Sequence, residues 1–246
     1  MKKTTIFSCF LMMLALFAAT NSYPADLVYE SFESGYGMFH SGYNDSDIVS
    51  DATAPLGSHS LRFTFPEGFS AGDAPDIVTA SFSDQQEIWG RVYFKLSSGF
   101  SFHPYEQKLV FLWTGRSNFY FSIGDTKIFG CWQGDGRTYN NYDQPDISTG
   151  VWNRLDFHMS TDGVVQLWVN DSLTLNLSNV PFNGGAFDSI AFTPVYGGMG
   201  GSVPKTQYIW FDGGQISTTP IGPAAPLPPP PAQGLQPSPP THLTIN

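Results

Sequence analysis

Most of the chain is built from short runs in which apolar and polar residues alternate, separated by Gly, Pro, Asn and Asp. The clearest pair lies between Gly150 and Asn170, where two alternating runs flank a Thr-Asp-Gly turn. A period of two places neighbouring side chains on opposite faces of a β-strand. No long stretch carries apolar residues at helical spacing. The pattern therefore predicts an all-β protein.

At least eleven such runs can be assigned between Leu27 and Ser217. They cover residues 27–33, 60–65, 76–82, 87–96, 108–114, 118–124, 151–160, 163–170, 172–178, 187–195 and 206–217. Strands of this number and length are typical of one large β-sandwich, and the chain shows no internal repeat at a fixed period. We therefore expect a single sandwich domain over residues 26–218.

The two ends of the chain differ from this β-rich part. Residues 1–25 begin with two lysines and continue with an apolar run, which is the layout of a secretory signal peptide and is too short for a membrane span. Residues 219–246 contain ten prolines, so we expect an extended, disordered tail or a linker to another module. The chain is thus predicted to be secreted, periplasmic or on the cell surface, and not an integral membrane protein.

Cysteine and charge narrow the class of protein further. Loss of the signal peptide would leave Cys131 as the only cysteine, so no internal disulfide is expected, which together with the leader is typical of a bacterial exported protein. The leader holds two of the 11 Lys and Arg residues, which leaves nine against 21 Asp and Glu. Such an acidic chain is a poor partner for nucleic acid. Aromatic residues at 15% suit exposed rings that stack on a glycan, and we expect a monomer.

Several stretches resemble the concanavalin A-like lectin/glucanase superfamily. The hairpin from Trp152 through Asp162-Gly163 to Asn170 resembles its central hairpin, and "LVYESFESG" and "YIWFDGGQIS" resemble its first and last strands. The stretch "IWGRVYFKLSSGFSFHPYEQKLVFLW" resembles polysaccharide-lyase-like members. The resemblance implies a jelly-roll β-sandwich of two antiparallel sheets. Because the superfamily contains lectins, binding modules, glucanases and lyases, it implies glycan interaction without selecting an activity.

A glycoside hydrolase would need two carboxyl groups that flank the scissile bond. The Glu-x-Asp-x-x-Glu motif of laminarinase-type glucanases is absent from the chain. No two of the five glutamates after the leader fall on one strand face in the middle of the sequence. The aspartates at 135, 143 and 146 belong to a Gly- and Asn-rich loop. These observations disfavour a hydrolase.

A polysaccharide lyase needs a cation or amide to neutralise a uronate carboxylate, and a Tyr, His or Lys to move protons. Alternation places Arg91 and Tyr93 on one strand face, and Lys108 begins the next strand, so these three are expected to share a face. With His158 they form the candidate catalytic set. The "RTELR" and "QIH" motifs of alginate lyases are absent, and the alternative is that the basic residues are solvated side chains of an outer sheet face.

Aromatic and loop residues supply candidates for ligand binding. The set is Trp89, Arg116, Tyr120, Trp132 and Tyr139. Trp132 stands beside a loop rich in Asn, Asp, Gly and Tyr, which predicts a ligand-facing position. Aromatic residues also fill sandwich cores, and Trp113, in phase with Leu109 and Phe111, is expected to be a core residue.

The superfamily resemblance also implies one structural Ca²⁺ between the first and last strands. Glu33 and Asp212 match the positions of its carboxylate ligands, and the alternative is an unrelated surface acid on each strand. The histidines show no metal-binding spacing, and Cys131 is expected to be buried. No other cofactor is predicted.

The sequence as a whole favours an exported carbohydrate-binding or polysaccharide-processing domain that engages a glycan on its concave face. One alternative is a β-eliminating lyase that acts on a uronate-containing polymer. Another is a non-catalytic surface or adhesion module for which the Pro-rich tail serves as a spacer.

Overall fold

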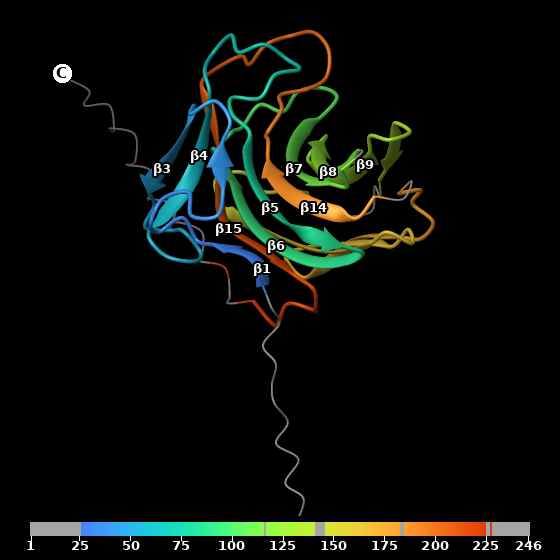
Figure 1. Ribbon diagram of the computed structural model, residues 1–246. Coiled ribbons are helices and arrows are strands. Elements are labelled where there is room, and N and C mark those ends of the chain that lie inside the picture. Colours follow the sequence, from blue (N-terminus) through green and yellow to red (C-terminus); the bar gives the residue numbers. More distant parts are fainter. Residues whose placement is uncertain (1–25, 116, 141–145, 183–184, 225–226, 228–246) are drawn as a thin grey trace, which may run out of the picture.

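The computed structural model describes residues 26–115, 117–140, 146–182, 185–224 and 227 (Figure 1). These residues form β-strands joined by turns and loops, as the alternating pattern predicted. No helix among them is long and apolar enough to cross a membrane. The predicted signal peptide and most of the predicted tail lie outside the described residues.

One sheet, called sheet A, has the strand order β13–β12–β11–β6–β15–β4–β3, and β1 pairs with β15 beside this path. Its strands are β1 Asp26–Glu30, β3 Ser46–Ser50, β4 His59–Phe65, β6 Glu87–Leu96, β11 Trp152–Ser160, β12 Val165–Val169, β13 Ser172–Leu177 and β15 Gln207–Ser217. All of its pairings are antiparallel. The first and last strands of the described sandwich are therefore neighbours.

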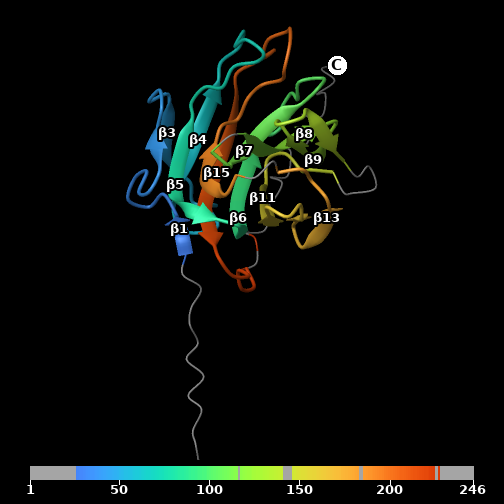
Figure 2. The same cartoon turned by 45° about the vertical axis from the view of Figure 1, so that its right-hand side comes forward.

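The second sheet, called sheet B, has the order β10–β9–β8–β7–β14–β5–β2 and is also antiparallel. Its strands are β2 His40–Ser41, β5 Val78–Gln85, β7 Gln107–Trp113, β8 Asn118–Gly124, β9 Lys127–Trp132, β10 Arg137–Tyr139 and β14 Phe187–Phe192. Figures 1 and 2 show the two sheets as the two layers of the molecule. The described chain is an all-β sandwich, as predicted.

The core lies between the sheets and is rich in phenylalanine. Phe192 of sheet B stacks on Phe211 of sheet A with ring centres 4.6 Å apart, and Phe121 contacts Phe157 across the same interface at 5.4 Å. Burial of rings of this size is the main force that joins the layers. Cys131 is free and buried, so the prediction of its burial is confirmed.

Every run predicted as a strand contains one, but four strands were not foreseen. They are β2, β3, β9 and β10. Strand β9 was not predicted because Gly130 interrupts its pattern of apolar residues. A side chain at this position would meet the ring of Phe119, since a Cβ there would lie 2.4 Å from Phe119 Cζ. The glycine is thus required by core packing and does not mark a turn.

Candidate functional site

The residues predicted to share one face lie on different sheets. Arg91 and Tyr93 belong to β6 of sheet A, whereas Lys108 belongs to β7 of sheet B. Each side chain is on the outer face of its own sheet, so the two groups lie on opposite sides of the sandwich. The predicted common face is therefore wrong. The chain changes layers between β6 and β7, and alternation within a strand carries no information about that change.

On sheet A the polar row of β11 is engaged in ion pairs. The two oxygens of Asp156 accept hydrogen bonds from two arginines. Arg91 Nε donates to one at 2.5 Å, and Arg154 Nε donates to the other at 2.6 Å. Arg154 also pairs with Asp171 and is buried. One carboxylate thus links two guanidinium groups, which holds Arg91 in place beside β11.

His158 and Trp89 lie side by side at the end of this row. Their rings stack with centres 4.0 Å apart and planes inclined by 9°. His158 Nε2 lies 2.7 Å from a Glu87 oxygen and Nδ1 lies 3.1 Å from Gln166 Oε1. Both predicted residues therefore take part in contacts within sheet A.

Tyr93 is closed off from solvent. It is 2% exposed and packs with Ala54 and Trp152. This burial raises the pKa of the Tyr93 phenol above its usual range. The neighbouring Lys95 is paired with Asp51, and its Nζ lies 4.7 Å from the ring centre of Trp152. The outer face of β6 is thus covered at the position where a lyase base was predicted.

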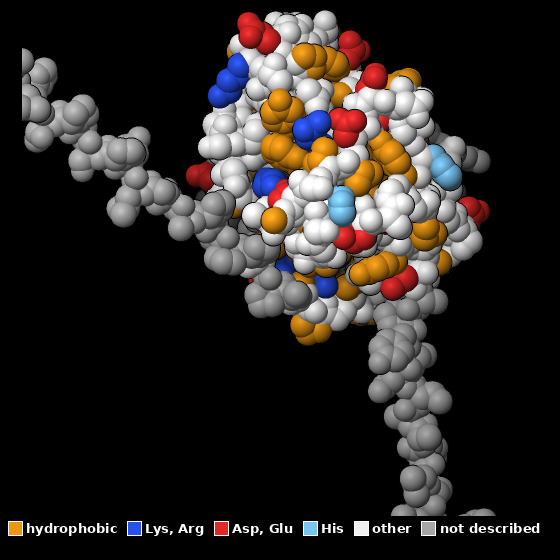
Figure 3. Space-filling view, turned by 90° about the vertical axis from the view of Figure 1, so that its left-hand side faces the viewer, with side chains coloured by type: hydrophobic (Ala, Val, Ile, Leu, Met, Phe, Trp, Pro, Cys, Tyr) orange, Lys and Arg blue, Asp and Glu red, His pale blue; other side chains and the backbone are white. Residues whose placement is uncertain are grey.

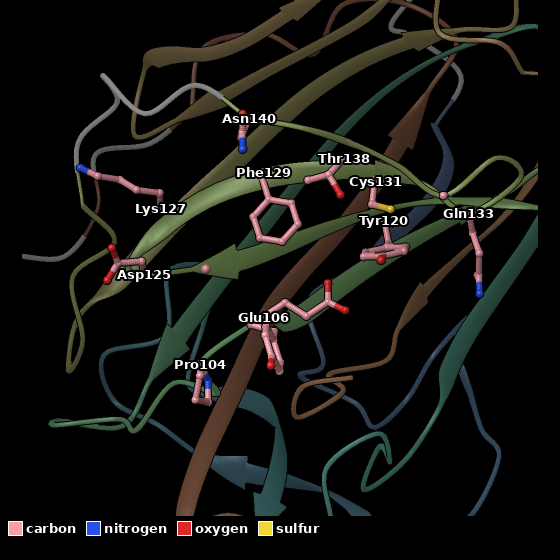
Figure 4. A pocket seen from close by; sticks show the side chains of 13 residues that line it. Pro104, Glu106, Tyr120, Asp125, Lys127, Phe129, Cys131, Gln133, Thr138 and Asn140 are labelled. Carbon is pink, nitrogen blue, oxygen red and sulfur yellow. The ribbon is translucent and has the colours of Figure 1, made fainter. Parts of the chain in front are cut away.

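The outer face of sheet B is hollowed by a cavity of about 520 Å³. Figure 4 shows its lining, which comes from β8, β9, β10 and the loop before β7. Tyr120 projects from β8, and Phe129 and Cys131 project from β9. Tyr105 and Asp125 belong to loops. Tyr120 is the predicted ligand-binding residue that the structure places in this cavity.

Tyr120 lies in a cluster with Glu106 and Lys108. Lys108 Nζ is 4.7 Å from the ring centre of Tyr120 and 3.5 Å from Glu106 Oε1. Ser122 Oγ donates a hydrogen bond of 3.2 Å to the other oxygen of Glu106. The cluster brings an ammonium, a carboxylate and a phenol together on neighbouring strands.

Burial raises the pKa values of Tyr120 and of the neighbouring Cys131. Desolvation, together with the nearby Cys131 thiol and Glu106 carboxylate, raises the pKa of Tyr120 far above its usual range. Burial likewise raises the pKa of the Cys131 thiol. The phenol and the thiol are therefore both protonated at neutral pH, and Tyr120 is a proton donor and not a ready base.

A row of aromatic rings continues from Tyr120 across β7. Phe111 lies 5.1 Å from Tyr120, and Trp113 stacks on Phe111 at 6.5 Å. Trp113 is 40% exposed, so its predicted place in the core is wrong. The register of β7 shifts between Lys108 and Val110, and this bulge turns Phe111 and Trp113 outward. Without the bulge, alternation counted from the buried Leu109 would place Phe111 and Trp113 in the core as well.

Trp132 and Tyr139, two further predicted ligand-binding residues, are not among the described residues that line this cavity. Trp132 is 1% exposed and packs edge-on against Phe182 at 5.0 Å, so its predicted ligand-facing position is wrong. It lies inward because β9 extends through it. Tyr139 is half-buried and stacks on Phe119 at 6.2 Å. Arg116 lies outside the described residues.

Sequence reasoning missed Glu106 and Tyr105 as site residues. Both belong to the segment that carries the chain from sheet A to sheet B. Glu106 was set aside because no second glutamate shares its strand. The available signal was the order Pro104-Tyr105-Glu106, in which an aromatic residue and an acid follow a proline between two predicted strands.

The predicted metal ligands Glu33 and Asp212 lie in the loop after β1 and in β15, and both bind the segment of residues 56–59. The Glu33 carboxylate accepts the backbone N–H groups of Ser58 and His59, both at 2.7 Å, which lowers its pKa to about 2. Asp212 is fully buried and accepts the N–H of Leu56 at 2.7 Å. Burial, with smaller effects from Glu33 and Asp51, raises the pKa of Asp212 to about 7.

These residues fit a cation in part. The second oxygen of Asp212 is buried and has no hydrogen-bond partner, which is costly for a carboxylate. Within the described part of the chain, no three His, Cys, Asp or Glu side chains are grouped as metal ligands. Ca²⁺ takes about six to eight oxygens, so backbone carbonyls and water would have to supply most of them.

The chain matches no protein-family model and no curated protein. It is similar to solved structures. "Cellulose induced protein, Cip1" matches with a TM-score of 0.61 and 16% identity over 80% of this chain and 100% of that one. Alginate lyase vAL-1 from Chlorella virus matches with a TM-score of 0.59 and 12% identity, over 74% and 93%. A double mutant of alginate lyase Aly36B, in complex with alginate tetrasaccharide, matches with a TM-score of 0.51 and 17% identity, over 81% and 94%.

Identities this low establish the fold alone. The similar structures and the two antiparallel sheets together show a concanavalin A-like jelly-roll sandwich. The fold that the sequence resemblance implied is therefore confirmed.

Proposed function

We propose that this protein binds a glycan on the outer face of sheet B. The observation that carries the proposal is the cavity of about 520 Å³ on the same face as exposed aromatic rings. Tyr105 is 73% exposed and Trp113 is 40% exposed. Sugars present C–H groups that pack on aromatic faces, while their hydroxyls need fixed polar partners.

The cavity lining supplies such polar partners. Gln133, Thr138 and Asn140 bring amide and hydroxyl groups to its edge, and Asp125 brings a carboxylate. Amides and hydroxyls both donate and accept hydrogen bonds, as sugar hydroxyls do. The similarity to a cellulose-induced protein and to alginate lyases supports a glycan as the ligand class.

Binding is tested by titration calorimetry with neutral and uronate-containing oligosaccharides. Tyr105→Ala should weaken binding of the best ligand by about three- to tenfold, because it removes an exposed aromatic ring that lines the cavity. Tyr43→Ala is the matched control, since Tyr43 is 59% exposed and is not among the residues that line the cavity. Equal weakening by both variants, or no binding by any glycan, would overturn the proposal.

A β-eliminating lyase is the second candidate, and the cluster of Lys108, Glu106 and Tyr120 favours it. In this reaction a base takes the C5 proton of a uronate, whose electron pair forms the C4–C5 double bond. The C4–O bond breaks and the leaving oxygen takes a proton. Lys108 would pair with the uronate carboxylate, Glu106 would accept the proton, and the protonated phenol of Tyr120 would donate one.

The comparison with Aly36B supports this assignment by residue type. The variant solved with alginate tetrasaccharide has a lysine and a tyrosine replaced by alanine. The test is incubation with alginate, glucuronan and pectin, because the unsaturated product absorbs in the ultraviolet. An absorbance that stays flat with all three polymers would remove the lyase candidate and leave glycan binding untouched.

Two expectations complete the proposal. One structural Ca²⁺ between Glu33 and Asp212 would neutralise the buried carboxylate beside the chain ends of the sandwich. When bound it would supply charge compensation and a bridge, not catalysis. Residues 1–25 would direct export of a bacterial protein and then be removed, which mass spectrometry of the exported protein would show.

A further inference from the structure

The chain turns back after β15 and covers part of the outer face of sheet A. The described residues of this segment, 221–224 and 227, are called the strap. Figure 1 draws it at the red end of the chain, close to β1 and β15. Ile221 lines a cavity of about 310 Å³ together with Trp89 and Trp168. The strap is therefore in contact with the sandwich from its first residue.

The strap follows β6 in order. Pro223 and Ala224 line a second cavity, of about 140 Å³, with Arg91 and Tyr93. Leu227 packs against the cluster of Ala54, Tyr93 and Trp152. The strap thus lies near Trp89, Arg91 and Tyr93 in turn, the residues that alternate on the outer face of this strand.

One hydrogen bond fixes the middle of the strap. Arg91 Nη1 donates to the carbonyl oxygen of Gly222 at 3.0 Å, while Arg91 Nε is held by Asp156. Prolines have no N–H to offer, so a proline-rich segment is recognised through its carbonyl groups. A guanidinium that is already oriented by a carboxylate donates such a bond without losing much side-chain freedom.

The surface beneath the strap is aromatic. Trp152 and Trp210 stand on either side of Lys95, whose Nζ is 4.7 and 4.9 Å from their ring centres. Figure 3, seen from the side of β3 and β4, shows hydrophobic side chains gathered among charged ones. Aromatic grooves of this kind bind proline-rich chains, whose extended conformation is already stiff and loses little entropy on binding. Residues 219–246 contain no Asp, Glu, Lys or Arg, so the attraction is apolar.

We propose that the outer face of sheet A is a binding surface for a proline-rich segment, and that its occupant is the strap of this same chain. The surface explains why Arg91 and Tyr93 are engaged and covered. The inference does not depend on what the cavity binds.

Leu227→Asp in the full-length chain tests the strap, and Leu235→Asp is the matched control in the same proline-rich region. A charge at Leu227 should release the strap, lower the melting temperature by about 2–4 °C, and speed cleavage of residues 219–227 by proteinase K. The Leu235 variant should behave as the wild-type chain. Identical melting and cleavage for both variants would overturn the proposal.

A synthetic peptide of residues 219–230 tests the surface itself. It should quench or shift the tryptophan fluorescence of the Leu227→Asp chain and bind the wild-type chain at least tenfold more weakly, because the strap already fills the site. Binding should change little with salt, since the peptide carries no charged side chain. Equal binding to both chains would contradict self-occupancy. A melting temperature of the wild-type chain that rises with protein concentration would show that a second copy supplies the segment.

Discussion

The two outer faces of the sandwich carry similar residues but differ in what those residues are free to do. On sheet A, Arg91 and Lys95 are each paired with an aspartate, and Tyr93 is buried beneath other side chains. On sheet B, Tyr120 lines an open cavity and Trp113 faces solvent. The residue types alone would have assigned the same chemistry to both faces.

The difference shows that engagement of side chains separates a structural face from a functional one. Where a carboxylate already links two guanidinium groups, the charges hold strands together, and the remaining Arg91 Nη1 donates to Gly222 of the strap. On sheet B, Lys108 is also paired, with Glu106, but Glu106 and Tyr120 line an open cavity in which a ligand can replace water.

The largest expected effect is on uronate elimination, the second candidate activity. Tyr120→Phe should lower the rate by about 100-fold or more, because it removes the proton donor in the cavity. Tyr93→Phe, on the opposite face, should leave the rate unchanged. Because the pKa of Tyr120 is raised, the wild-type rate should not fall from loss of this proton below about pH 10. Ultraviolet absorbance of the product measures the rates of both variants and the pH dependence of the wild-type rate. Equal losses of rate in the two variants would show that the two faces do not differ in this way.

Asp156→Ala should destabilise the fold by about 3–5 kcal/mol, because it leaves Arg91 and the buried Arg154 without their shared carboxylate. Urea unfolding measures the change. Glycan affinity of the folded variant should equal that of the wild-type chain. A loss of affinity would place part of the binding surface on sheet A.

Asp212→Asn should change how stability depends on pH. The folded-state pKa of about 7 lies above the usual 3.8, so the protonated carboxyl stabilises the fold below about pH 4, and this contribution is lost as pH rises through 7. In the presence of a chelator, the wild-type chain should lose about 4 kcal/mol relative to the variant between pH 4 and pH 8, as an upper estimate. Parallel pH profiles of the two proteins in urea unfolding would show that the Asp212 carboxyl is not perturbed.

Calcium should have the smallest effect. Excess Ca²⁺ at pH 8 should raise the melting temperature of the wild-type chain by a few degrees, since a ligand that binds only the folded state stabilises it. Mg²⁺ should do less, because it needs a tighter octahedral site. Asp212→Asn should remove the response to Ca²⁺. An unchanged melting temperature in the wild-type chain would withdraw Glu33 and Asp212 as metal ligands.

Much of the fold was predictable because a period of two is a local property. The run Glu87–Leu96 is a strand over the predicted residues, and Asn118–Gly124 likewise. The site on sheet B was predictable only in part. Tyr120 was named as a ligand-binding residue and Lys108, beside it, as a catalytic one, whereas Glu106 was not named and Trp113 was assigned to the core. Trp113 was missed because a bulge in β7 reverses the alternation, and nothing in the local sequence marks that bulge.

The sequence by itself determined that the chain forms alternating strands, a β-sandwich and a proline-rich end, because these follow from the spacing and type of neighbouring residues. Only the tertiary structure decided which sheet each strand joins. That step separated Arg91 and Tyr93 from Lys108, brought Glu106 beside Tyr120, and turned Trp132 into the core. The physical reason is that pairing between distant strands depends on how the whole core packs, and no single stretch of sequence contains that information.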